Sequence, residues 1–393
     1  MAVDSNESKS FSDLEAEPPR AQAGIFKMKG AKKAAEKKKN VAAEKGQKEK
    51  PVDKEKTEVA PPPQAKTTQS VAPAQGHPFV EQWCQRALDM GVEKLRDEFR
   101  QLAKYTTPGM TQNAFNKNSD PSVERTKNRY QDVPCQDQFI VSLLAPAPTD
   151  YIHANYVATP MGNRRFICTQ GPLDQTVEEF WWMIHQQKVE QIIMLCKTIE
   201  TGKYKCAQYW PMNVGEKKEF KSGLVVECVA GARPMERDCE IQITMLNVTV
   251  AGQTMSVRHL HWTDWPDRGV PPCKLTSLEL LSAVRGSKVP IVVHCSAGIG
   301  RTGTIVAIEY ILEKISAPAA KDEVLLPMPD LVRQIRDMRA YSIQNDLQYL
   351  YIHRVMLNYF LDKYKAKYAG ILTPENVLKL EKFIKDYNAA GGQ

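Results

Sequence analysis

The sequence predicts an α/β protein in which helices flank a sheet. Segments with helical spacing of apolar residues alternate with short strand-like segments along most of the chain. No second linker and no internal repeat interrupts residues 80–364. A composition of 42% hydrophobic and 25% charged residues is ordinary for a globular protein. These observations favour one large folded domain.

Apolar periodicity places the helices. Most of them have one apolar face, whereas the segment 347–361 is apolar on nearly every side and is expected to be buried. The last helix has Pro374 in its first turn and is expected to pack on the domain as a surface helix. The predicted helices cover residues 83–104, 174–186, 302–313, 331–338, 347–361 and 374–387.

Short apolar or alternating runs indicate the strands. The run 255–262 places Val257, His259 and His261 on one face, as a half-buried strand does. The run 291–293 is apolar throughout and leads into a glycine-rich turn. The predicted strands cover residues 192–195, 224–229, 241–250, 255–262 and 291–293.

The N-terminal segment differs in composition from the rest of the chain. Residues 27–56 are dense in lysine and have almost no aromatic or branched apolar side chains, and residues 61–63 are consecutive prolines. Such a segment cannot bury enough surface to offset the entropy lost on ordering. We expect a disordered Lys-rich tail and Pro-rich linker over residues 1–76, the folded domain over 77–365 and an amphipathic helix within 366–393.

The net charge of +7 is modest and arises partly from this lysine run. The run is compatible with a nuclear-import signal, a tether to acidic membranes, an RNA contact or a plain solvated tail. Interspersed acidic residues and the lack of aromatic side chains argue against a nucleic-acid partner. No apolar stretch approaches the roughly 20 residues of a membrane span, and no signal peptide is apparent. We expect a monomer that is cytoplasmic or, through the lysine-rich tail, nuclear.

Cysteine usage predicts reduced thiols and neither a metal nor another cofactor. The nine cysteines are odd in number, and they form no C-x-x-C pair and no Cys/His cluster at metal-ligand spacing. An isolated cysteine is usually a buried structural residue. Cys295 has a different context, because it opens a loop that ends at an arginine.

This phosphate loop, residues 295–301, is suited to bind and attack a phosphate. The residues between Cys295 and Arg301 are mostly small: Ser296, Ala297, Gly298, Ile299 and Gly300. Their backbone N–H groups can point inward as an anion-binding nest. The predicted helix 302–313 follows at once, and its N-terminal dipole favours both a bound anion and a nucleophilic thiolate at Cys295. Arg301 supplies a planar fork that can hold two phosphoryl oxygens.

Attack on a phosphate ester also needs an acid for the leaving oxygen and then a base for the hydrolytic water. Asp267 is the candidate. It lies in the acid loop, residues 265–271, where proline and glycine punctuate the chain and Trp265 can anchor a hinge, as a lid requires. Taken alone, an aspartate in such a turn is common.

Several separated motifs make the chain similar to the phosphotyrosine-specific, non-receptor protein tyrosine phosphatases over about residues 80–365. The matching segments are 294–303, 265–271, the substrate loop 127–133, the glutamine loop 344–349, and scaffold segments 150–156, 169–172 and 205–211. The resemblance implies a highly twisted mixed central sheet flanked by helices. It also implies hydrolysis of phosphotyrosine in proteins through a cysteinyl-phosphate intermediate, in signal transduction.

The resemblance implies the following roles for residues of the reaction. Cys295 would be the nucleophile, Arg301 the phosphate clamp, and Asp267 first the acid and then the base. Thr302 would donate a hydrogen bond to the thiolate and assist its departure. His294 would favour the thiolate form of the cysteine.

Further residues would position the water and the substrate. Gln344 would orient the hydrolytic water with help from Gln348. Tyr130 would stack on the phenyl ring and set a depth that excludes phosphoserine, and Asp132 would hold the substrate backbone. The amides of residues 296–300 would bind the phosphoryl oxygens.

Two further residues would support the site, and two positions differ from the usual family pattern. Glu200 would orient Arg301, and Lys205 would orient the acid loop; otherwise these two form an ordinary solvated ion pair. Asn345 stands where the family usually has threonine, which we expect to alter how Gln344 is positioned. Tyr341 is bulky where the family gates a secondary pocket, so doubly phosphorylated substrates are not expected to be favoured.

Other functions remain open. A phosphotyrosine-binding scaffold with little turnover would be expected to lack Cys295, Asp267 or Gln344, and all are present. A phosphoinositide phosphatase would be expected to carry lysines within the phosphate loop, where Ala297 and Ile299 are neutral. A dual-specificity phosphatase would lack the segment around Tyr130.

Overall fold

The computed structural model describes residues 78–119, 126–316 and 327–391. The predicted tail over residues 1–76 lies outside the described residues, so its disorder and the role of its lysine run stay predictions. Within the described ranges, no helix combines the length and the apolar character needed to cross a membrane.

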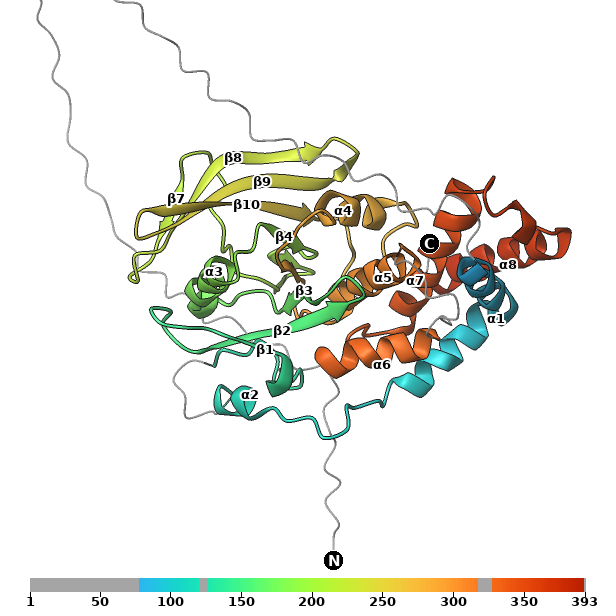
Figure 1. Cartoon of the computed structure of the whole chain (residues 1–393), viewed down its shortest axis with the longest axis horizontal. Helices are drawn as coiled ribbons and strands as arrows, with labels where there is room; N and C mark the ends of the chain where they lie inside the picture. The colour runs from blue at the N-terminus through green and yellow to red at the C-terminus, as the bar shows by residue number, and fades with distance from the viewer. Residues whose placement is uncertain (1–77, 120–125, 317–326, 392–393) are drawn as a thin grey trace, which may run out of the picture. The chain divides into compact units, whose positions relative to one another are not determined.

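A mixed sheet runs through the described part of the chain (Figure 1), with the strand order β1-β2-β3-β11-β4-β10-β9-β8-β7. The strands β3, β11, β4 and β10 are parallel neighbours, and the outer pairs are antiparallel. The strands of this sheet are β1 (Ile140–Ser142), β2 (Tyr151–Thr159), β3 (Gly162–Thr169), β4 (Gln191–Met194), β7 (Lys217–Glu219), β8 (Val225–Met235), β9 (Asp238–Val250), β10 (Gln253–Trp262) and β11 (Ile291–His294). A separate antiparallel pair comprises β5 (Ile199–Glu200) and β6 (Lys203–Tyr204).

Helices flank this sheet, which confirms the predicted α/β class. The helices are α1 (Pro78–Leu102), α2 (Asn113–Lys117), α3 (Val177–Gln186), α4 (Thr276–Val284), α5 (Gly300–Ser316), α6 (Met328–Met338), α7 (Asp346–Asn358) and α8 (Pro374–Gly391). Short helical turns are η1 (Asp137–Phe139), η2 (Asp174–Thr176), η3 (Tyr359–Lys363) and η4 (Ala369–Ile371). A kink in α1 lies at Gly91, whose φ of 64° falls in the left-handed region that glycine adopts readily.

Strands β2 and β3 are absent from the strands that the sequence predicts. Strand β2 is almost fully buried, yet it contains His153 and Asn155, which interrupt the apolar pattern. Their polar atoms are paired inside the fold: His153 Nε2 lies 2.8 Å from the Val133 carbonyl oxygen, and Asn155 Nδ2 donates to the Gln136 carbonyl oxygen at 2.9 Å. Buried polar groups are tolerated when they are paired in this way. The partners come from outside the strand, so periodicity within it gives no indication of them.

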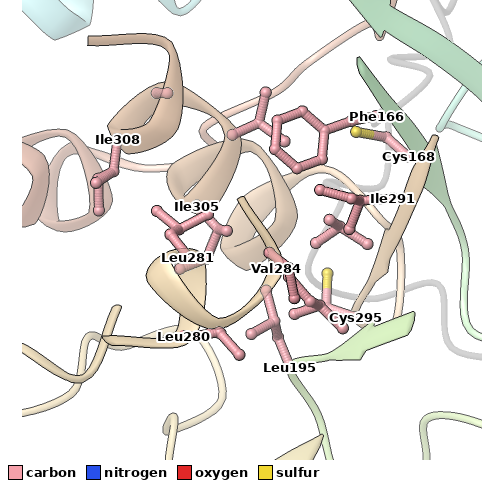
Figure 2. Packing of buried hydrophobic residues seen from close by; sticks show 14 of the residues in the cluster. Phe166, Cys168, Leu195, Leu280, Leu281, Val284, Ile291, Cys295, Ile305 and Ile308 are labelled. Atoms are coloured by element: carbon pink, nitrogen blue, oxygen red, sulfur yellow. The ribbon is translucent and has the colours of Figure 1, made fainter. Parts of the chain in front are cut away.

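The base of the candidate site is a tightly packed part of the core. All of β11 is buried, and its neighbours include Phe166 of β3 and Ile305 of α5 (Figure 2). Helix α4 contributes Leu281 and Val284 to the same cluster. Protein interiors of this kind are close-packed and resist displacement. The loop between β11 and α5 therefore starts and ends on fixed elements.

The C-terminal helix α8 packs against α1 and α7. Phe383 and Tyr387 are buried there. The side chains of Gln85 and Asn376 exchange two hydrogen bonds, at 3.2 and 2.7 Å, between α1 and α8. These contacts join the two ends of the described chain; the domain limits at residues 77 and 365 stay predictions.

Candidate active site

The phosphate loop lies between the end of β11 and the start of α5. Cys295 directly follows β11 and is 5% exposed, and Gly298 N donates to its Sγ atom at 3.3 Å. Gly298 has a φ of +70°, and a Cβ atom there would lie 2.0 Å from the Thr169 carbonyl oxygen. Only glycine fits this position, because both the backbone angle and the space exclude a side chain. The predicted small residues thus allow the loop to curl tightly around the sulfur.

Arg339 holds this loop from behind, a role that the sequence motifs do not indicate. Its Nε donates to the Gly298 carbonyl oxygen at 3.1 Å, and its Nη2 donates to the Ala297 carbonyl oxygen at 3.0 Å. It is fully buried, and its Nη1 also donates to Asn155 Oδ1 at 3.0 Å. Because Arg339 holds these carbonyl groups on the outer side of the loop, the N–H groups of the loop can face the other side. The residue ends an amphipathic helix, where an arginine would ordinarily be exposed, so only the contacts identify it.

His153 lies beside this arginine and is neutral. Its Nδ1 is 3.1 Å from Arg339 Nη1, so it accepts a hydrogen bond from the guanidinium. Burial, together with the charge of Arg339, lowers the pKa of His153 to about 3. A proton on Nδ1 would remove the acceptor and place two cations together.

His294 lies under Cys295 and is also neutral at pH 7. Its Nε2 is 2.8 Å from the hydroxyl of Tyr209, which lies equally close to His259 Nε2. Its Nδ1 is 3.2 Å from the Cys295 carbonyl oxygen. Burial lowers the pKa of His294 to about 3. It therefore adds no positive charge near the sulfur, and its contacts are with the backbone and with the tyrosine.

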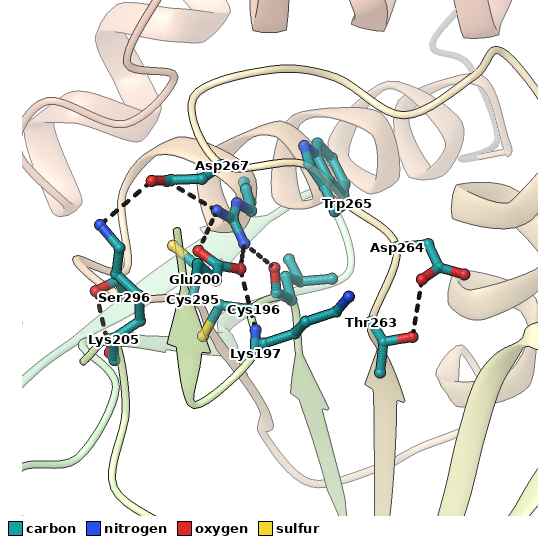
Figure 3. Close-up of polar contacts among 12 residues, drawn as sticks. Cys196, Lys197, Glu200, Lys205, Thr263, Asp264, Trp265, Asp267, Cys295 and Ser296 are labelled. Carbon is teal, nitrogen blue, oxygen red and sulfur yellow. Dashed lines mark hydrogen bonds and ion pairs between the residues drawn. The ribbon is translucent and has the colours of Figure 1, made fainter. Parts of the chain in front are cut away.

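Arg301 is fixed by a two-point ion pair with Glu200, which is labelled in Figure 3. Its Nη1 and Nη2 donate to the two carboxylate oxygens of Glu200 at 2.6 and 2.7 Å, and Nη1 also donates to the Leu195 carbonyl oxygen at 2.7 Å. Burial alone would lower the pKa of Arg301, but the Glu200 carboxylate more than offsets this and raises it. Glu200 is 8% exposed, so it is not part of a solvated surface ion pair.

Asp267 lies over this guanidinium, at the edge of the pocket. Its Oδ1 accepts from Arg301 Nη2 at 3.0 Å, and its Oδ2 lies 3.3 Å from Lys205 Nζ. The Asp267 side chain is 22% exposed, whereas that of Lys205 is 4% exposed. The structure thus pairs Glu200 with Arg301 and Lys205 with Asp267. The acid loop covers the phosphate loop in this arrangement.

Trp265 anchors one end of the acid loop. It is 1% exposed, and its Nε1 donates to the Gly269 carbonyl oxygen at 3.1 Å. Its ring contacts those of Trp262 and Tyr351, with centroid distances of 5.0 and 5.4 Å. A large buried side chain fixes the hinge while the middle of the loop stays at the surface.

The glutamine loop, residues 344–349, closes the opposite side. Gln344 N donates to Gln348 Oε1 at 2.8 Å. A Cβ atom at Gly300 would lie 3.0 Å from Gln344 Oε1 and 2.9 Å from Gln348 Nε2, so both side chains lie against the phosphate loop. Thr302 Oγ1 is buried and has no hydrogen-bond partner among the described residues, so its expected bond to Cys295 is not formed here.

Tyr130 brings the substrate loop to the rim. Its hydroxyl is 2.8 Å from Ser296 Oγ, which donates to the Lys205 carbonyl oxygen at 3.0 Å. Asp132 is half-buried, and desolvation raises its pKa. Within the described ranges it makes no hydrogen bond or ion pair with the phosphate loop. Its expected role in holding the substrate backbone stays a prediction.

The pocket as a whole is built for an anion. The Gly298 amide donates to the sulfur, the Arg301 guanidinium bonds the carboxyl group of Asp267, and two glutamines and Tyr130 contact the phosphate loop. No group of three or more His, Cys, Asp or Glu residues is arranged to hold a metal ion in the part of the chain that the structure describes. The arrangement can hold a tetrahedral oxyanion in line with Cys295 and exchange a proton through Asp267.

Comparison with known proteins gives consistent matches. Residues 124–358 match the protein-tyrosine phosphatase family. The human phosphatidylinositol phosphatase PTPRQ is 31% identical over 279 residues, which cover 69% of this chain and 11% of that protein. The human tyrosine-protein phosphatase non-receptor type 9 is 32% identical over 275 residues, covering 65% of this chain and 44% of that protein. The chain thus matches less than half the length of either relative.

Solved structures show the same fold. The catalytic domain of human protein tyrosine phosphatase non-receptor type 18 is 28% identical and superposes with a TM-score of 0.62. The superposition covers 72% of this chain and 99% of that domain. The same phosphatase in complex with HER2 phosphopeptides gives a TM-score of 0.63 at 28% identity.

Proposed function

The chain belongs to the protein-tyrosine phosphatase family, and we propose that it hydrolyses phosphotyrosine in proteins through a cysteinyl-phosphate intermediate. One observation carries the proposal: Cys295, Arg301 and Asp267 meet at a single anion-binding loop, although Asp267 comes from a separate segment of the chain. The products would be tyrosine and inorganic phosphate.

In the first step the Cys295 thiolate attacks phosphorus, and the bond from phosphorus to the tyrosine oxygen breaks. The loop amides and the Arg301 guanidinium hold the phosphoryl oxygens, where negative charge concentrates in the transition state. Asp267 donates its proton to the departing tyrosine oxygen. Its Oδ1 lies 3.0 Å from Arg301 Nη2, which places the carboxyl group within reach of a phosphate that the guanidinium holds.

In the second step water attacks the cysteinyl-phosphate, and the phosphorus–sulfur bond breaks. The Asp267 carboxylate, now deprotonated, accepts a proton from the water. Gln344, which lies against Gly300, orients that water with the help of Gln348. Rotation of Thr302 would let its unpartnered hydroxyl donate to the departing thiolate. Release of phosphate restores the starting state.

Tyrosine esters suit this pocket better than shorter or more charged substrates. Tyr130 stands at the rim, so the phosphoryl group must reach past an aromatic ring to approach Cys295. A phenyl ring spans that depth and stacks on the tyrosine, whereas the serine side chain is too short. One relative is named a phosphatidylinositol phosphatase, but Ala297 and Ile299 give this loop no additional cation for a multiply charged headgroup.

The partners follow from the same chemistry. We propose phosphotyrosine-containing proteins as substrates, with the phosphopeptide complexes of the type 18 phosphatase as the supporting comparison. Cytoplasmic or nuclear location, a signalling role and the monomeric state stay predictions.

The test uses the full chain and three substrates: 4-nitrophenyl phosphate, a phosphotyrosine peptide and the matching phosphoserine peptide. We expect hydrolysis of the first two, and trapping of labelled phosphate on Cys295 when the reaction is quenched in acid. Cys295→Ser should abolish turnover while phosphopeptide binding persists, because the hydroxyl is a far weaker nucleophile at neutral pH. Cys239→Ser, which changes an exposed cysteine on β9, is the matched control.

Two outcomes would contradict the proposal. Substantial turnover by Cys295→Ser would exclude the covalent route. Binding of phosphotyrosine peptides without hydrolysis by the unmodified chain would instead favour the scaffold function. Vesicles that contain phosphatidylinositol phosphates, assayed for phosphate release, distinguish the lipid substrate class.

A further inference from the structure

Asn345 connects the acid loop, which carries the candidate proton donor, to the glutamine loop, which would position the hydrolytic water. It is the N-cap of α7, and its Oδ1 accepts from Gln348 N at 2.9 Å. Its Nδ2 donates to the carbonyl oxygen of Arg268 at 3.3 Å. Arg268 directly follows Asp267 in the acid loop. One amide group therefore bonds the helix that carries Gln348 and the backbone next to the candidate acid.

The acid loop needs such support in this conformation. Arg268 has a φ of 58°, in the left-handed region that a non-glycine residue adopts only at a cost in energy. A hydrogen bond to the carbonyl of this residue stabilises the conformer in which it occurs. Asn345 donates that bond from a different part of the chain, whereas the bond from Trp265 Nε1 to Gly269 lies within the loop itself.

Binding of a phosphoryl group makes this bond more important. The guanidinium of Arg301 now donates to Asp267 Oδ1, and phosphoryl oxygens would compete for the same donor. The carboxyl group would then lose one of its two ionic contacts, keeping the one with Lys205. The bond from Asn345 to Arg268 is unaffected by that competition, because it involves only the backbone of the acid loop.

We propose that Asn345 is a positioning residue that couples closure of the acid loop to the placement of the glutamines. Its oxygen fixes the backbone of Gln348, whose side chain accepts from Gln344 N at 2.8 Å, and its nitrogen fixes the acid loop. The acid loop and the glutamine loop then adopt their working positions together. This inference rests on the proposed phosphatase function. It also goes beyond the sequence-based expectation that Asn345 alters only the position of Gln344.

The decisive variant is Asn345→Ser. Serine is as good an N-cap as asparagine, but its side chain is too short to reach the Arg268 carbonyl, and it adds no charge. We expect kcat/KM for phenyl phosphate to fall about fivefold, the worth of one modest hydrogen bond. The fall for 4-nitrophenyl phosphate should be smaller, because a better leaving group depends less on the acid. The melting temperature should be unchanged.

Asp346→Asn is the matched control. It changes the adjacent residue in the first turn of α7 and removes an ion pair with Arg96, at 2.8 Å, without touching the acid loop. For this variant, the ratio of kcat/KM for phenyl phosphate to that for 4-nitrophenyl phosphate should equal the ratio for the unmodified chain. A merely structural role for Asn345 predicts the opposite pattern: a lower melting temperature and an equal loss for both esters would overturn the proposal.

A second measurement does not depend on turnover. The NMR signal of the Trp265 indole N–H reports the position of the acid loop, and tungstate serves as the oxyanion probe. We expect the tungstate-bound signal of Asn345→Ser to differ from that of the unmodified chain, and that of Asp346→Asn to coincide with it. Identical signals in all three proteins would refute the coupling. Failure of the unmodified chain to hydrolyse any ester would instead refute the proposed function.

Discussion

The phosphate loop and the acid loop lie in contact, yet they are built in different ways. The phosphate loop is almost entirely buried, and Arg339, the Tyr130 hydroxyl and the adjoining core hold it at several points. The acid loop is buried only toward its ends, at Trp265 and at Val270 and Pro271, and its middle is partly or fully exposed. The phosphate loop is thus fixed before the anion arrives, whereas few contacts hold the acid loop, which carries the proton donor.

This difference suits the division of labour between the loops. Amides that stabilise a developing charge are most effective when they need no rearrangement during the reaction. A proton donor that covers the substrate must also move aside for entry and release. Substitutions that remove a support of the phosphate loop backbone should therefore affect stability and binding together, and those in the acid loop should affect mainly the rate.

The largest expected effect tests the acid loop. Asp267→Asn should lower kcat by about 10²- to 10⁴-fold, the usual contribution of a general acid, with little change in the melting temperature. Asp264→Asn changes an exposed aspartate just before the acid loop, which accepts from Thr263 Oγ1 at 3.2 Å, and serves as the control. A loss of stability comparable to that of a core substitution would show that the acid loop is not lightly held.

The next effect tests the phosphate loop without changing any residue that would touch the substrate. Arg339→Met should lower the free energy of unfolding by about 3 kcal/mol, because two loop carbonyls and Asn155 lose a buried donor. Inhibition by inorganic phosphate should weaken as well. Urea denaturation and inhibition assays measure the two effects.

Arg333→Met supplies the comparison for that experiment. Arg333 lies on the same helix and pairs with Asp330 at a site where both side chains are 43% exposed. Such exposed pairs contribute little to stability. Equal destabilisation by the two variants would mean that the phosphate loop does not depend on Arg339.

Acidification should weaken the support beneath the phosphate loop. The pKa values of His153 and His294 are lowered to about 3, below the ordinary value of 6.5, so the unfolded chain binds more protons between these limits. The stability they contribute is present above about pH 6.5 and is lost as the pH falls toward 3, by up to about 1.4 kcal/mol per pH unit for each histidine. Urea denaturation at several pH values measures this slope, and His153→Asn should reduce it. An unchanged slope would contradict a neutral His153.

The smallest expected effect concerns Tyr341, which lies shortly before the glutamine loop in the chain. Tyr341 has a φ of 60° and is half-buried. We propose that it restricts the neighbouring pocket, so the unmodified chain should hydrolyse singly and doubly phosphorylated peptides with similar kcat/KM. Tyr341→Gly should favour the doubly phosphorylated peptide by no more than about fivefold, since exposed charge contacts are weak. A strong preference in the unmodified chain would contradict this role for Tyr341.

The sequence also predicted much of the fold. Cys295, Arg301 and Asp267, which it proposed for the site, lie together in the structure, and their roles stay predictions. The predicted helices and several strands occur within a few residues of their expected ends, because burial on one face imposes a short period along the chain. Strand β2 was missed because His153 and Asn155 hide its buried character. The positions of Cys295, the small loop residues and Arg301 depend on neighbouring backbone angles, and such local requirements are visible in the sequence.

What the sequence alone determined is therefore the α/β class and the motifs: a cysteine, an arginine and an acid loop, from which we propose a reaction with phosphate esters. The tertiary structure decided which unforeseen distant groups support them, such as Arg339 behind the phosphate loop and His153 beside that arginine. The same holds for the neutral state of His294, which burial imposes. A contact between distant segments leaves no periodic or compositional trace, so it becomes apparent only once the chain is folded.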